Sequence, residues 1–167
     1  MFNSKHKIRM GAGRKKYLDV WPINFFTSVK TDIEDNTSLF LLQLACIVNM
    51  VPKWRKHRIR VFLLSPGESG AAGREREVLR LLDVLRVRAE TVLLDWNKFP
   101  EENMKDNLSV ANDLMRSQCD ETAVSFIYMP RPPQLSTEHS LFLQQLELLT
   151  RDLPPTILVS GVRKVTY

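Results

Sequence analysis

Hydrophobic and polar positions along the chain alternate between two periods, and this alternation predicts five strands separated by four helices. Runs rich in aromatic and β-branched residues are typical of strands. Stretches whose apolar residues recur every three or four positions are typical of helices. The predicted strands are residues 17–26, 58–65, 89–96, 122–130 and 154–162, and the predicted helices are residues 36–51, 74–87, 107–118 and 136–152.

The helices differ in how much of their surface is apolar. The helix over 36–51 is apolar almost all round, which predicts burial on most sides. Two others are amphipathic, and between them and the strands we expect polar connections, including a flexible turn over 65–73. The expected inward-facing residues are Val78, Leu81, Leu82 and Leu85 in one helix and Leu141, Phe142, Leu146 and Leu149 in the other.

Strict alternation of strand and helix predicts an α/β fold with a parallel sheet and helices on both faces. Right-handed crossovers favour a five-stranded, doubly wound sheet with the strand order 3-2-1-4-5. The strands that begin at Tyr17, Arg58 and Thr122 should be central, because their nearly continuous apolar runs fit burial on both faces. This layout resembles the universal stress protein architecture.

The positive charge of the chain is concentrated at one end. The whole chain carries a formal charge of +5, but residues 1–16 hold six basic residues and no acidic one, so the remainder carries −1. We therefore expect a basic, disordered leader over 1–16 and a folded domain over 17–167. A nearly neutral domain with no long basic face disfavours a nucleic-acid partner.

Cysteine content and hydropathy indicate the class of protein. Cys46 and Cys119 are too few and too far apart for a disulfide scaffold or a zinc site, and we expect Cys46 to be a small core residue of a cytosolic domain. The longest apolar stretch, residues 38–51, is shorter than the roughly 20 residues that span a bilayer. It is better explained as a buried helix.

No motif for catalysis or for a cofactor is evident. Gly67, Gly70 and Gly73 follow a predicted strand, but their spacing matches neither dinucleotide-binding nor P-loop patterns. Neither His57 nor His139 has both an Asp and a nucleophile nearby in the predicted layout. We therefore predict that the chain is not an enzyme and holds no cofactor or metal.

A basic cluster between a predicted helix and a predicted strand is the candidate interaction site. It comprises Lys53, Trp54, Arg55, Lys56 and Arg58. These cations could simply neutralise the carboxyl end of the preceding helix in solvent. They could instead contact anionic lipid headgroups or a protein partner. Both interpretations stay open at this point.

Several segments resemble the C-terminal cytosolic region of the cation–chloride cotransporters, solute carrier family 12, and most of all its divergent, cotransporter-interacting branch. That family has an Ile-Asp-Val-Trp strand, a Leu-rich helix, a basic Trp-containing segment and an Ile-Arg-Val-Phe strand. Its last strand follows a Lys-Asp-Leu-Pro-Pro run. The matching positions here are Leu18–Trp21, Leu39–Val51, Trp54, Ile59–Phe62, residues 81–87 and residues 146–167. Residues 22–28 and Ser160 depart from the transporting members.

The resemblance implies a regulatory and interaction domain on the cytosolic face of a membrane, forming the distal part of a larger protein. Its implied partners are its own transmembrane core, a second copy or another cotransporter of the family, and the membrane surface. The implied role is dimerisation and modulation of chloride-coupled cation symport. The alternative is a stand-alone nucleotide-binding domain of the universal stress protein type.

Overall fold

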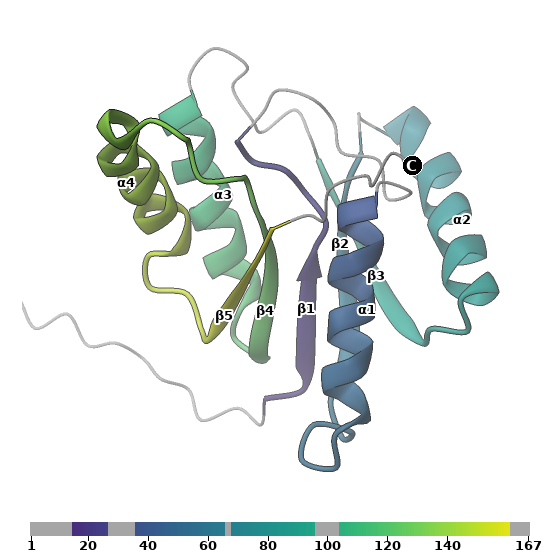
Figure 1. Cartoon of the computed structure of the whole chain (residues 1–167). Helices are drawn as coiled ribbons and strands as arrows, with labels where there is room; N and C mark the ends of the chain where they lie inside the picture. The colour runs from purple at the N-terminus through teal and green to yellow at the C-terminus, as the bar shows by residue number, and fades with distance from the viewer. Residues whose placement is uncertain (1–14, 27–35, 66–67, 96–103, 161–167) are drawn as a thin grey trace, which may run out of the picture.

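The computed structural model describes residues 15–26, 36–65, 68–95 and 104–160. Strands and helices alternate along the chain, and one short 3₁₀ helix, η2, precedes the last helix (Figure 1). In chain order the elements are β1 (Tyr17–Trp21), α1 (Asn36–Met50), β2 (Arg58–Ser65), α2 (Glu68–Val84), β3 (Ala89–Asp95), α3 (Met104–Gln118), β4 (Thr122–Met129), η2 (Ser136–Glu138), α4 (His139–Thr150) and β5 (Thr156–Ser160).

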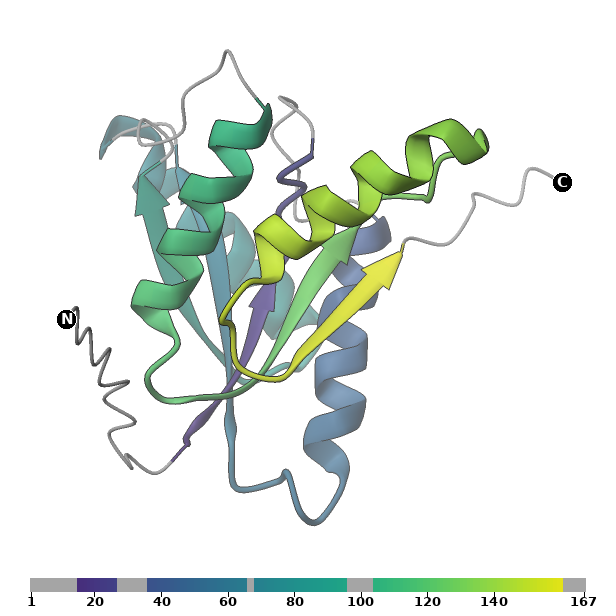
Figure 2. The same cartoon turned by 90° about the vertical axis from the view of Figure 1, so that its left-hand side faces the viewer.

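The strands form one five-stranded sheet in the order β3-β2-β1-β4-β5, and every neighbouring pair is parallel. β1, β2 and β4 are central, as the apolar runs predicted. The predicted α/β class and strand order are confirmed, and the arrangement is consistent with the universal stress protein architecture. Two views at right angles show the twisted sheet between its helices (Figures 1 and 2).

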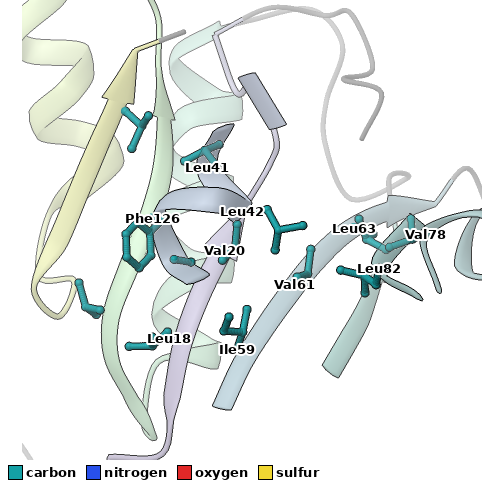
Figure 3. Close-up of a cluster of buried hydrophobic side chains, with 13 residues drawn as sticks. Leu18, Val20, Leu41, Leu42, Ile59, Val61, Leu63, Val78, Leu82 and Phe126 are labelled. Atoms are coloured by element: carbon teal, nitrogen blue, oxygen red, sulfur yellow. The ribbon is translucent and has the colours of Figure 1, made fainter. Parts of the chain in front are cut away.

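Helices cover both faces of the sheet and bury two separate apolar clusters. α1 and α2 pack on one face, where Leu41 and Val78 are fully buried in the first cluster (Figure 3). α3 and α4 pack on the other face, where Leu108 and Leu149 are fully buried in the second cluster. Successive side chains of a strand point to opposite faces, so each central strand contributes to both clusters.

β1 shows how this alternation works. Leu18 and Val20 belong to the first cluster, whereas Trp21 belongs to the second. Trp21 stacks on Phe62 of β2 with ring centroids 3.8 Å apart and planes 3° from parallel. This contact joins two central strands across the face that α3 covers.

Two predicted boundaries differ most from the structure. The predicted strand over 17–26 ends at Trp21, because Pro22 has no N–H to donate to a sheet. Beyond it the chain turns, with the N–H of Phe26 donating to Oδ1 of Asn24 at 3.1 Å. The flexible turn predicted for 65–73 is replaced from Glu68 onward by the first turns of α2, because Ala, Glu and Arg favour a helix more than the two glycines oppose it.

Two residues predicted to face inward are exposed. Leu85 lies just beyond the end of α2 at Val84 and is 41% exposed. Leu141 is 46% exposed because it lies about 140° around the helix from Leu146, which packs against the second cluster. Cys46 is half-buried against the first cluster rather than fully inside it.

Residues 1–14 of the expected leader over 1–16 lie outside the described residues. Lys16 is described, and its backbone continues the pairing of β1. Its N–H donates to the carbonyl of Glu121 at 2.7 Å, and its carbonyl accepts from the N–H of Arg58 at 2.8 Å. Among the described helices, none combines the length and hydropathy needed to span a bilayer.

Replacing Leu149 with Ala should lower the free energy of unfolding by about 2–5 kcal/mol, because it leaves a cavity in the second cluster. Leu143→Ala is the matched control in the same helix, since Leu143 is 63% exposed. It should change stability by less than about 0.5 kcal/mol. Urea denaturation measures both, and equal losses would contradict the assigned packing of α4.

Candidate interaction site

The predicted interaction residues lie mainly in the loop over 51–57, which joins α1 to β2 at the amino edge of the sheet. This loop and the end of α1 extend beyond the strands in both views (Figures 1 and 2). The predicted position, opposite the carboxyl ends of the strands, is confirmed. Ligands of doubly wound sheets usually bind at those carboxyl ends, so the loop is a surface of another kind.

Side-chain and backbone hydrogen bonds give the loop a defined shape. Nδ2 of Asn49 donates to the carbonyls of Trp54 and His57, at 3.2 and 2.8 Å. The N–H of Trp54 in turn donates to the carbonyl of Val51 at 2.8 Å. The indole of Trp54 is half-buried against the first cluster. The loop is therefore anchored to the core.

The three cations within the loop are exposed. Nη2 of Arg55 donates to the carbonyl of Met50 at 3.4 Å, so Arg55 neutralises the end of α1 as one interpretation of the sequence required. In the part of the chain that the structure describes, neither Lys53 nor Lys56 has an ion pair or a hydrogen bond from its side chain. Their charges are directed to solvent.

Arg58 is not part of this exposed cluster. It is the first residue of β2, pairs with Glu90 of β3 and donates to the hydroxyl of Tyr17 at 2.8 Å. It lines a separate open hollow of about 540 Å³ between α2 and the amino ends of β2 and β3. Arg58 thus differs from the loop cations in having partners on β1 and β3, and its membership of the interaction site stays a prediction.

Apolar residues beside the cations were missed in the sequence. Ile47, Met50 and Val51 are 60%, 71% and 46% exposed. The expectation that α1 is buried on most sides is wrong at its carboxyl end, because that end extends past the sheet. We call the exposed residues Ile47, Met50, Val51, Lys53, Arg55 and Lys56 the α1 tip. Residues 36–57 contain no Asp or Glu, so no acid from this segment offsets the cations.

A buried ion pair lies inside the sheet, close to the same edge. Nε and Nη2 of Arg60 donate to the two carboxylate oxygens of Asp19 at 2.9 and 2.8 Å. Nη2 also donates to the carbonyl of Gln118, at the end of α3, at 2.9 Å. The hydroxyl of Thr122 donates to Asp19 from β4. The guanidinium carbon of Arg60 lies 4.3 Å from the ring centroid of Tyr17.

The Asp19 side chain of this pair is almost fully buried, whereas that of Arg60 is 13% exposed. Burial raises the pKa of the Asp19 carboxyl, while the hydrogen bonds from Arg60 and Thr122 and the charge of Arg60 act in the opposite direction. Asp19 is directly opposite Arg60 in the register of β1 and β2. The sequence carried a signal for it: Asp19-Val20-Trp21 and Arg60-Val61-Phe62 place opposite charges at the same step of two central strands.

The other candidate groups have structural contacts. Nδ1 of His57 lies 3.0 Å from the carbonyl of Trp54, and Nε2 of His139 lies 3.0 Å from that of Pro133. Gly70 and Gly73 lie in α2 rather than in a phosphate-binding loop. Within the described residues, no three His, Cys, Asp or Glu side chains are grouped to hold a metal. Much of the carboxyl edge, including Gly67, is outside the described residues.

Replacing Arg60 with Met should lower the free energy of unfolding by about 3 kcal/mol or more, because it leaves the Asp19 carboxylate buried without its partner. Arg116→Met is the matched control, since its ion pair with Asp113 is exposed, and it should cost less than about 0.5 kcal/mol. The double variant Asp19→Leu/Arg60→Met should be more stable than Arg60→Met alone. A double variant as unstable as the sum of its parts would contradict the pairing.

No protein-family model matches the chain. Curated proteins do: solute carrier family 12 member 9 of Danio rerio is 37% identical over 162 residues, 89% of this chain and 18% of that protein. The Xenopus laevis protein of the same name is 37% identical over 90% of this chain and 19% of its own length. Vacuolar cation-chloride cotransporter 1 of Saccharomyces cerevisiae is 30% identical over 94 residues, 51% of this chain and 8% of that protein.

These relatives are named as a solute carrier or a cotransporter, not as enzymes. The chain spans about a fifth of the length of the solute carriers that it matches. The family resemblance predicted from the strand and helix motifs is confirmed. The chain is a homologue of one region of the solute carrier family 12 cation–chloride cotransporter proteins.

Proposed function

We propose that this chain is a regulatory interaction domain that works with a cotransporter-type membrane core at the cytosolic face of a membrane. The observation that carries the proposal is the homology: nearly nine-tenths of this chain aligns with less than a fifth of a solute carrier. A compact α/β unit without a described membrane-spanning helix fits an appended domain better than an ion pathway. The proposed role is to bind neighbouring proteins and modulate chloride-coupled cation transport.

Contact, rather than chemistry, is the proposed mode of action. The most distinctive surface is the α1 tip, where three exposed cations lie beside exposed apolar side chains. Histidines and the buried Asp19 are engaged in holding the fold. Because the interior on both faces of the sheet is closely packed, a displacement of the tip would be transmitted to the opposite surface.

Self-association is proposed through the far side of the molecule. β5 is an edge strand that pairs with β4 alone among the described strands, and its Ile157 is 39% exposed. Leu141 and Leu143 are also exposed, on α4, which covers the other face of the sheet from Ile157. Apolar side chains next to an open sheet edge favour pairing with a second copy or with a related domain.

Co-purification tests the proposed function. The Danio rerio relative is expressed without the segment that matches this chain, the chain is supplied separately, and the truncated protein is purified in detergent. The folded chain should co-purify with the truncated core. The control variant Phe62→Asp, which places a charge in the second cluster, should unfold and be absent from the complex. A folded chain that never co-purifies would contradict the proposal.

A further inference from the structure

The α1 tip combines three features. It projects beyond the amino edge of the sheet, as both views show (Figures 1 and 2). It exposes large apolar side chains at Ile47, Met50 and Val51. It carries cations within a segment that contains no acid. We propose that the α1 tip docks on the anionic surface of a lipid bilayer, its cations on headgroups and its apolar side chains in the interface.

Charge complementarity favours a lipid surface. A bilayer that contains anionic lipids presents uniformly negative charge, which attracts clustered basic residues and falls off within a Debye length. The side chains of Lys53 and Lys56 have no partner among the described residues, so no internal ion pair has to break. Arg55 is exposed as well. The charge of Arg58, by contrast, is already compensated by Glu90.

The shape and the apolar residues favour a lipid surface over a protein or nucleic acid. A projecting tip can insert between the headgroups of a bilayer, because lipids can move apart around it. A protein partner would need a cavity of matching shape. Met50 is 71% exposed and adjoins the cations, the arrangement in which interfacial segments insert apolar side chains beneath basic ones. Trp54 packs against the core, so the loop has no aromatic platform on which bases could stack.

The loop is also held in shape before it binds. Asn49 fixes the carbonyls of Trp54 and His57, and the indole anchors the loop to the first cluster. Docking therefore costs little ordering entropy. Three cations give only weak binding alone, so the inference rests on the proposed function: a core in the same bilayer would hold the tip at high effective concentration.

Vesicle flotation tests the docking surface. The full chain is mixed with a large excess of phosphatidylcholine vesicles with or without phosphatidylserine, so that weak binding of the isolated chain is detected. Because residues 1–16 are also basic, the test is run in a background of Lys5→Gln, Lys7→Gln, Arg9→Gln and Arg14→Gln. Binding should require phosphatidylserine and fall as salt rises. Absence of binding to either vesicle would overturn the proposal and leave a protein surface as the occupant.

Two matched pairs of variants locate the contact. Lys53→Glu/Arg55→Glu/Lys56→Glu should weaken partitioning by more than tenfold, at roughly fivefold per basic residue. Arg80→Glu/Arg88→Glu/Arg131→Glu changes the net charge equally at other exposed sites and should weaken it far less. Met50→Ser should weaken binding, whereas Val84→Ser, at a residue 77% exposed on α2, should not. Equal losses within either pair would overturn the assignment to the tip.

The outcomes separate this inference from the proposed function. Vesicles contain no protein core, and co-purification in detergent contains no bilayer. If the chain does not bind vesicles but still co-purifies with the core, the lipid contact is contradicted and the proposed function is not. Vesicle binding without co-purification supports the tip assignment and contradicts the proposed core partner.

Discussion

A guanidinium buried between the two innermost strands ties four elements of this domain together. Arg60 of β2 binds both oxygens of Asp19 in β1, reaches the last turn of α3 through the carbonyl of Gln118, and meets the hydroxyl of Thr122 through their shared carboxylate. A buried ion pair stabilises the folded state little more than well-packed apolar residues would. Removing one partner, however, lowers the free energy of unfolding strongly, because the other charge stays buried. A shift of β2 by one residue would separate the charges, so the pair opposes every other register of the central strands.

The fixed register determines what is presented at the amino edge. The register fixes where the loop before β2 enters the sheet, and α1 ends beyond the sheet at the same edge. The carboxyl end of an apolar helix is thereby left in solvent, with Met50 and Val51 exposed next to three cations. Arg58, only two residues further, is also exposed, but its side chain is bound to Tyr17 and Glu90. The tip and the buried pair thus lie toward the same edge of the sheet.

Periodicity predicted the fold class and the central strands, because apolar runs and amphipathic stripes report burial directly. The strand order was predicted from the handedness of the crossovers. Periodicity failed where local chemistry or neighbouring elements decide the outcome. Pro22 ended β1 early, and helix-forming residues converted the glycine-containing turn after β2 into the start of α2. The charge pattern of the sequence predicted the cations of the candidate site. It did not predict the exposed apolar residues beside them. Whether Ile47 is covered depends on how far α1 extends past the sheet, which no local pattern encodes.

The central claim is that this domain functions as part of a larger cotransporter-type membrane protein. An immunoblot of fractionated cells from the source organism, with an antibody raised against residues 136–167, tests it most directly. The account predicts a band in the membrane fraction several times heavier than 19.4 kDa, since homologous segments make up about a fifth of their proteins. A single band near 19.4 kDa in the soluble fraction would contradict it and favour a free-standing domain.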